Sequence, residues 1–178
     1  MTDTDIIEAL RAKLAVPSGR HLYGVLGTYV SLEHFAKKLQ QAKTLDGQNF
    51  PAPLSVTRGI LQSIPDKEFL QLVQDEAKRP EPTTAHVAQA FEKFLRRTLT
   101  GKGLVVLAQL ELLFAYNLEL NLLRTMAADQ DRVLLLLPGK REAGRIIMFH
   151  ETSSRESPQA SYTLPSNLIA DNNLWELR

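Results

Sequence analysis

Short, fully apolar runs alternate along this chain with longer segments in which apolar residues recur every three or four positions. The clearest apolar runs are residues 104–107 and 133–137, which contain only leucine and valine. Runs without polar alternation are typical of parallel strands that are covered on both faces. Strands that alternate with helices predict one α/β domain over residues 1–178, a three-layer fold with a mainly parallel sheet flanked by helices.

Several segments carry the apolar spacing of core-facing helices. We predict a helix over residues 4–14 within an N-terminal helix and turn of residues 1–19, and another helix that runs on from Ser31. A further helix is predicted after Pro65, and Thr83 or Thr84 is expected to cap the one that follows. The positions expected to be buried in these helices include Leu32, Phe35, Ala36, Leu39, Phe69, Leu70, Leu72, Val73, Val87, Phe91, Phe94 and Leu95.

Turn residues and polar stretches mark where other elements end. Pro138 and Gly139 are expected to form a turn after the second apolar run, and the polar residues 153–161 are predicted to form a mobile loop. Besides the two apolar runs, the predicted strands are residues 21–26, 54–56, 145–150, 162–164 and 167–170.

The junction after the first predicted strand has the outline of a phosphate-binding loop. It reads GVLGTYVS and retains Gly24, Gly27 and a hydroxyl at Ser31. In such loops backbone N–H groups surround the phosphates, a lysine neutralises them and the hydroxyl binds Mg²⁺. Here Thr28 takes the place of a small residue and Val30 takes the place of the lysine. Loss of that charge-assisted contact removes about 1.5–3 kcal/mol, so nucleotide hydrolysis at this junction is not expected.

The strand that should supply an acidic residue shows a second defect. A partner strand in such a site ends in Asp or Asp-Glu, which holds the metal. Ala108 and Gln109 occupy those positions, and Glu111 lies a few residues late. Tyr29 also replaces the second glycine of the loop. These changes indicate a scaffold without catalytic residues. For Glu111, the alternative to a metal ligand is a surface glutamate at a strand-to-helix junction. For the loop, the alternative is an ordinary strand–turn–helix junction that never bound phosphate.

Composition sets outer limits on the function. The formal net charge of +1 gives no global attraction to nucleic acid, and the absence of cysteine excludes disulfides and thiolate metal sites. The four histidines lack the spacing of metal ligands, so no metal site is expected. No apolar run is long enough for a membrane span and the N-terminus is unlike a secretory signal, so we expect a cytoplasmic protein without membrane association.

Small basic groups are the remaining candidates for binding. Lys140 and Arg141, together with Arg145, follow the second apolar run at the expected carboxyl edge of the sheet, where ligands bind in open α/β folds. These residues are candidate contacts for nucleic acid or for a partner protein. Arg96 and Arg97, with Lys102, form a second basic group. The alternative for both groups is solvated surface charge, which is the common state of such residues.

Four short motifs follow one another in the later part of the chain: Leu110-Glu111-Leu112-Leu113-Phe114, Leu122-Leu123, Pro138-Gly139 and the strand from Ile146 to His150. In order and pattern they resemble the BrxF family, small P-loop proteins of BREX anti-phage defence systems. With the junction after the first predicted strand included, the resemblance spans about residues 20–152. The resemblance implies an AAA-like, P-loop NTPase-like fold and a role in bacterial defence. Because Val30 and Ala108 replace the residues that bind nucleotide and metal, ATP binding is not implied, and no cofactor is expected.

Three hypotheses follow. The first is a non-catalytic accessory subunit, a pseudo-ATPase that binds other defence proteins, with a homo-oligomer also open. The second is a divergent NTPase that uses Ser31 and Glu111 and is active only with a partner subunit. The third is a DNA-binding adaptor that uses the basic groups, ranked last because no aromatic residues are interleaved with them to stack on bases.

Overall fold

The fold is seen in a computed structural model that describes residues 1–76, 80–101, 103–149 and 162–178. The predicted mobile loop at 153–161, His150 and Lys102 lie outside the described residues. None of the helices in the described ranges is long and apolar enough to cross a membrane.

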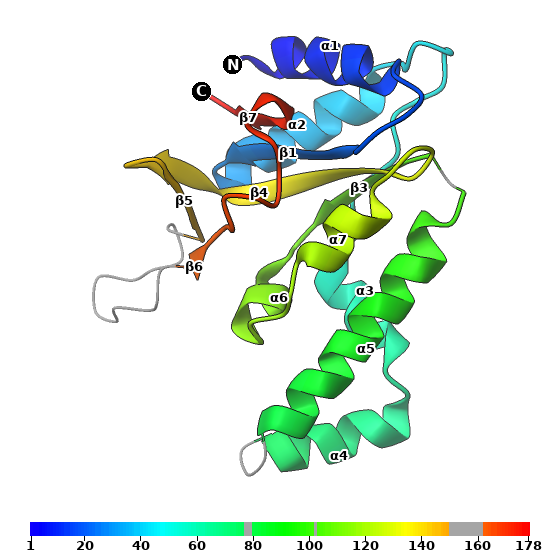
Figure 1. Ribbon diagram of the computed structural model, residues 1–178, viewed down its shortest axis with the longest axis vertical. Coiled ribbons are helices and arrows are strands. Elements are labelled where there is room, and N and C mark those ends of the chain that lie inside the picture. The colour runs from blue at the N-terminus through cyan, green and yellow to red at the C-terminus, as the bar shows by residue number, and fades with distance from the viewer. Residues whose placement is uncertain (77–79, 102, 150–161) are drawn as a thin grey trace.

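A seven-stranded, mainly parallel sheet forms the middle layer (Figure 1). Five strands run parallel in the order β2-β3-β4-β1-β7, while β5 pairs with β4 and β6 pairs with β5 in antiparallel fashion. This arrangement confirms the predicted α/β fold with a mainly parallel sheet flanked by helices. The strands are β1 Leu22–Gly27, β2 Leu54–Ser55, β3 Leu104–Ala108, β4 Arg132–Glu142, β5 Arg145–Met148, β6 Tyr162–Thr163 and β7 Leu174–Glu176.

Helices cover both faces of this sheet (Figure 1). On one face lie α1 Asp3–Leu14 and α2 Tyr29–Gln41. The helices that belong to the other side are α3 Val56–Ser63, α4 Asp66–Glu76, α5 Pro80–Leu99, α6 Glu111–Ala115 and α7 Asn121–Met126, and a short 3-10 turn, η1 Asp171–Asn173, precedes β7.

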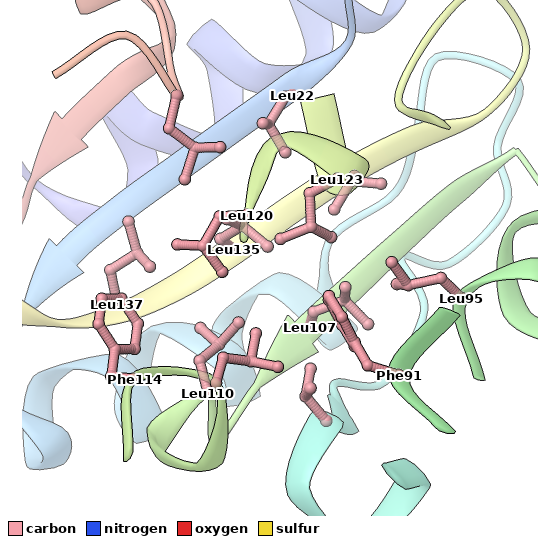
Figure 2. Packing of buried hydrophobic residues seen from close by; sticks show 14 of the residues in the cluster. Leu22, Phe91, Leu95, Leu107, Leu110, Phe114, Leu120, Leu123, Leu135 and Leu137 are labelled. Atoms are coloured by element: carbon pink, nitrogen blue, oxygen red, sulfur yellow. The ribbon is translucent and has the colours of Figure 1, made fainter. Parts of the chain in front are cut away.

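The central strand β4 divides two apolar cores. Leu135 and Leu137 pack against side chains of β3, α5, α6 and α7, as Figure 2 shows. Leu134 and Leu136 point to the opposite side, into the core formed with α1 and α2. Because successive side chains of a strand point to opposite faces, a run of five buried apolar residues is what a doubly covered strand needs.

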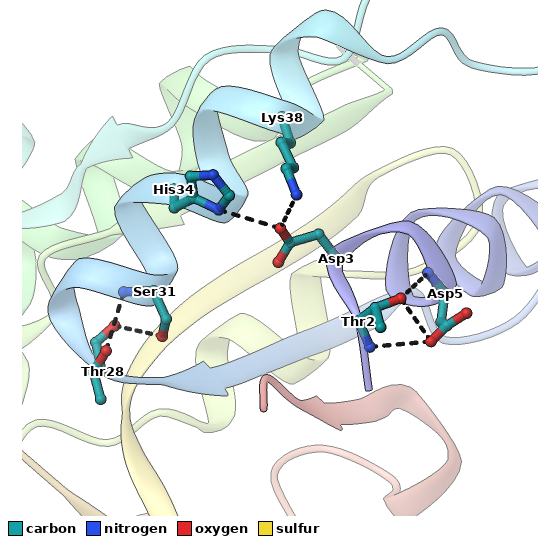
Figure 3. Close-up of polar contacts among 7 residues, drawn as sticks. All are labelled: Thr2, Asp3, Asp5, Thr28, Ser31, His34 and Lys38. Carbon is teal, nitrogen blue, oxygen red and sulfur yellow. Dashed lines mark hydrogen bonds and ion pairs between the residues drawn. The ribbon is translucent and has the colours of Figure 1, made fainter.

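A small polar cluster joins α1 to α2, the two helices that cover the core containing Leu134 and Leu136 (Figure 3). The Asp3 carboxylate lies 2.7 Å from Lys38 Nζ and 3.2 Å from His34 Nδ1. Thr2 and Asp5 form a reciprocal capping box that begins α1. The Met1 amino group donates a hydrogen bond of 2.7 Å to the Glu176 carbonyl oxygen, so the two chain ends meet beside β7.

Three boundary predictions are wrong. The residues 167–170 form a turn, and the closing strand is β7, which follows it. The helix α5 begins at Pro80, a favourable residue for a first turn, so Thr83 and Thr84 lie inside the helix and do not cap it. The apolar positions Leu120, Leu123 and Met126 predict one helical stretch between the two apolar runs, but the structure divides it into α6 and α7.

The predicted turn at Pro138-Gly139 is also wrong, because β4 continues through both residues into a hairpin with β5. Gly139 pairs with Met148, and a Cβ atom on Gly139 would lie 2.7 Å from the Ile147 carbonyl oxygen. The chain reverses instead at Ala143 and Gly144, which have φ values of 48° and 77°. Positive φ at both central residues is typical of a type I′ hairpin turn, in which asparagine is preferred at the first position.

This turn predicts opposite effects of two substitutions. A left-handed conformation costs an ordinary residue about 1–2 kcal/mol, so Ala143→Asn should recover part of this and raise the free energy of unfolding by about 0.5–1 kcal/mol. Gly139→Ala should lower the free energy of unfolding by about 1–3 kcal/mol, because the added methyl group meets backbone. Urea unfolding curves measure both. If the chain turned at Pro138-Gly139, Ala143→Asn would bring no gain.

Candidate functional site

The junction between β1 and α2 is shorter than a phosphate-binding loop. Strand β1 runs to Gly27 and α2 begins at Tyr29, so Thr28 alone connects them. Gly24 lies inside the strand, where a Cβ atom would be 2.7 Å from Leu174 Cδ1. This glycine therefore serves close packing within the sheet. The helix also begins two residues before the predicted start at Ser31.

The polar groups of this junction are used to begin the helix (Figure 3). Thr28 Oγ1 accepts a hydrogen bond of 3.0 Å from the Ser31 N–H, and Ser31 Oγ donates one of 3.1 Å to the Thr28 carbonyl oxygen. A Cβ atom on Gly27 would lie 2.5 Å from Ser31 Oγ, so the strand end must be glycine for this cap to close. The side chain of Val30 is 78% exposed, as expected of a surface residue.

A hydrogen bond joins this junction to the end of β3. The Tyr29 hydroxyl donates to Glu111 Oε1 at 3.0 Å. Since β4 lies between β1 and β3 in the sheet, this contact bridges the two connections that flank β4. The structure thus brings the β1–α2 junction and the end of β3 together, as expected for two parts of one site. The residue that joins them is Tyr29, which in the sequence is only a replacement for the second glycine of the loop.

The residues in the expected acidic positions have backbone roles. Ala108 pairs with Ser55 of β2. Gln109 adopts a left-handed φ of 57°, and its carbonyl oxygen accepts hydrogen bonds from Thr57 N–H at 3.1 Å and from Thr57 Oγ1 at 2.9 Å. These bonds hold the start of α3 against the end of β3. Unusual backbone conformations at strand ends are common at functional sites, but here the contact is structural.

The hollow beside this bridge does not favour a phosphate. It has a volume of about 350 Å³ and is lined by Thr57, Gln109, Glu111, Leu112 and Ala115. The one charged group among these is a carboxylate, which repels an anion. Within the described residues, no group of three or more His, Asp or Glu side chains is placed to hold a metal ion.

The basic residues predicted at the sheet edge lie on the β4–β5 hairpin, beside carboxylates. Lys140 Nζ is 3.1 Å from Glu142, and Arg141 is 3.2 Å from Asp171. Arg145 pairs with Glu142 in the strand register. The structure does gather the three cations on one hairpin. Their charge is largely balanced locally, which weakens them as a surface for nucleic acid.

Helix α4 exposes apolar residues that its helical spacing predicts to be buried. Helix α4 contains no buried residue, and the exposed fractions of Phe69, Leu70 and Val73 are 38%, 68% and 55%. Figure 1 shows why: α4 lies beside the far end of α5 and projects beyond the sheet. The expectation that these three residues are buried is therefore wrong. Leu72 is the apolar residue of α4 that packs against the core.

The helix that carries this apolar surface is acidic. The helix carries Asp66, Glu68, Asp75 and Glu76 against the single cation Lys67. Helical spacing of apolar residues cannot distinguish a core face from an interface, because both have the same period. The signal that was available is this excess of acidic residues.

Comparison with protein-family models, with curated proteins and with solved structures finds no match for this chain.

One hydrogen bond ties α4 to the body of the protein and predicts a shifted titration. The Tyr116 hydroxyl, next to α6, donates to the Glu76 carboxylate. Burial, the hydrogen bond to Glu76 and the charge of Glu76 raise the pKa of Tyr116 to about 12. An unfolded tyrosine titrates near pH 10, so the stability contributed by neutral Tyr116 is complete below about pH 10 and is lost as the pH rises through about 12.

An ultraviolet difference titration of the four tyrosines tests this assignment. Tyr116→Phe should remove the highest transition. Glu76→Gln should lower the pKa of Tyr116 but leave it above the ordinary value, because burial is the larger cause. A wild-type titration that ends near pH 10 would contradict the contact.

Proposed function

We propose that this protein is a non-catalytic adaptor with an AAA-like fold, which acts in the cytoplasm by binding other proteins of a bacterial anti-phage defence complex. The observation that carries the proposal is the exposed apolar surface of α4, formed by Phe69, Leu70 and Val73. A contiguous apolar surface rimmed by polar residues is typical of a protein-binding site. Its place on a projecting helix leaves it accessible to a large partner (Figure 1).

The absence of catalysis is supported by the chemistry at the β1–α2 junction. The Ser31 hydroxyl, which would bind Mg²⁺ in a phosphate loop, is engaged in the helix cap, and Glu111 is hydrogen bonded to Tyr29. A one-residue connection offers too few backbone N–H groups to surround a phosphate chain.

The defence role rests on the BrxF-like motifs, and the strand order supports the AAA-like fold. Strand order places the carboxyl ends of β1 and β3 on either side of β4, where an AAA-like domain would carry its loop strand and its acidic strand. The motif at Leu110 to Phe114 forms the start of α6 directly after β3.

The acidic charge of α4 specifies the partner. The described residues of α4 carry four carboxylates and one lysine, so a partner with an apolar centre and basic residues around it is favoured. Pairing of α4 with α4 of a second copy would place like charges together, which disfavours a symmetric dimer through this helix.

Nucleotide turnover is the first test. We expect no ATP hydrolysis above background, with or without Mg²⁺, because no residue at the β1–α2 junction is free to stabilise charge that develops on a phosphate. Release of inorganic phosphate is measured on the protein alone and on the assembled complex. Turnover that is lost in Glu111→Ala would contradict the proposal and favour the divergent NTPase.

Partner binding is the second test. The tagged protein is co-expressed with the products of its neighbouring genes, and co-purification is quantified for the wild type, Leu70→Glu and Val73→Glu. Each substitution places a charge in the apolar surface, and loss of one anchoring side chain should weaken binding by at least about 10-fold. The free energy of unfolding should change little, because both side chains are exposed.

Val30→Glu and Leu45→Glu are matched controls, since these side chains are 78% and 70% exposed elsewhere on the molecule. Both controls should bind as the wild type does. Equal loss in all four variants, or full binding by Leu70→Glu, would argue against α4 as the binding surface.

A further inference from the structure

A second hollow lies at the carboxyl ends of β2 and β3, between α3 and α5. Its volume is about 540 Å³, within the range of small-molecule sites. The polar residues that line it are Ser55, Arg58, Gln62, Arg97, Thr98 and Gln109. Ligands of open α/β sheets bind at this edge. Neither the proposed adaptor function nor the surface of α4 uses these residues.

The hollow is electrostatically one-sided. Arg58 of α3 and Arg97 of α5 both line it, and no Asp or Glu does. Neither guanidinium forms an ion pair within the part of the chain that the structure describes. Arg96, the next residue on α5, differs from them because it lies 2.7 Å from Glu92. Both cations that border the hollow thus lack a counter-charge among the described residues.

The position of Arg58 strengthens this point. It lies in the first turn of α3, where aligned peptide dipoles favour negative charge and disfavour a cation. A cation placed there is unfavourable within the protein itself. An anion bound between Arg58 and the opposite arginine removes that disadvantage.

A mostly buried threonine adds a hydroxyl to the lining of the hollow. Thr98 is 6% exposed and lines the hollow on the same helix as Arg97. A ligand oxygen would accept a hydrogen bond from this hydroxyl. The amides of Gln62 and Gln109 add further donors around the same space.

The two helices that carry the arginines are held firmly together. A Cβ atom on Gly59 would lie 2.3 Å from Phe94 Cδ2, so α3 and α5 cross in direct contact at this glycine. The Thr57 bonds to the Gln109 carbonyl oxygen fix the start of α3 on the sheet. Both guanidiniums therefore extend from rigid elements, which is the requirement for a preorganised site.

We propose that this hollow binds the phosphate group of a small molecule. Arg58 and Arg97 would donate paired N–H groups to the phosphate oxygens, and Thr98 would donate a third hydrogen bond from below. Planar guanidinium groups match the geometry of phosphate oxygens, whereas a lone ammonium acts as a point charge. The binding site is separate from the β1–α2 junction and needs neither Ser31 nor Glu111.

Isothermal titration calorimetry with pyrophosphate tests the site. We expect saturable binding that weakens as salt is raised, and an increase in Kd of about 10-fold or more in Arg58→Gln and in Arg97→Gln. Arg96→Gln is the matched control: it removes the same charge from the neighbouring position of the same helix and should leave Kd unchanged. Thr98→Val keeps the side-chain volume and should raise Kd by a smaller factor.

Three outcomes would overturn the proposal: no binding of pyrophosphate, equal weakening by Arg96→Gln, or binding that survives loss of both Arg58 and Arg97. Inorganic phosphate and ADP are titrated in parallel, and tighter binding of ADP would identify a nucleotide as the source of the phosphate. Single-stranded DNA is also tested as a competitor of pyrophosphate. If its binding is weakened by Arg96→Gln as well as by Arg97→Gln, the surface binds polyanions diffusely, and this too would overturn the proposal. Thermal melts of each variant confirm that it is folded. Arg97→Gln should leave co-purification through α4 unaffected, so partner binding by α4 and phosphate binding at the hollow are tested independently.

Discussion

Burial of β4 on both faces is the constraint on which the rest of the structure depends. Every leucine of the run 134–137 is almost completely removed from water, and the side chains alternate between two cores. Full burial of one such side chain contributes about 1.5–3 kcal/mol, and neither core exists without the helices that cover it. The helices α1 and α2 must therefore lie on one face, and α5, α6 and α7 on the other. Parallel neighbours on both sides of β4 then bring the carboxyl ends of β1 and β3 to one edge.

That edge is where an α/β protein ordinarily binds its ligand, and at the end of β1 it is occupied by the protein's own contacts. The close approach of Gly27 to Ser31 lets α2 begin one residue after β1 ends, with Thr28 as its cap. The Tyr29–Glu111 hydrogen bond then ties the β1–α2 junction to α6. A substitution that looks like damage in a nucleotide site is, in this geometry, a structural contact.

Surfaces away from the β1–α2 junction carry the features that remain unexplained by stability. The apolar residues of α4 gain little from folding, since they stay exposed, and Tyr116 and Leu72 supply the attachments that hold this helix. The arginines at the hollow between α3 and α5 face no carboxylate among the described residues that line it. Both features sit on the long segment between β2 and β3, whose helices α3 and α5 bury one side in the core. The sides of this segment that face away from the core are free to carry binding surfaces.

The sequence by itself determined the class of fold and most of its elements. The continuous apolar runs at 104–107 and 133–137 indicate strands buried on both faces, and the spacing of apolar residues in α2 indicates a helix. The sequence also indicated that lysine and acid are missing, through Val30 and Ala108. Tertiary structure decided the rest. Whether Leu70 is core or surface depends on what lies beside α4, and whether Pro138-Gly139 turns depends on β5 pairing across it. Gly24 is a packing residue only because Leu174, far along the chain, lies against it. Local patterns carry the period of an element, but burial and contact are set by neighbours that are distant in sequence.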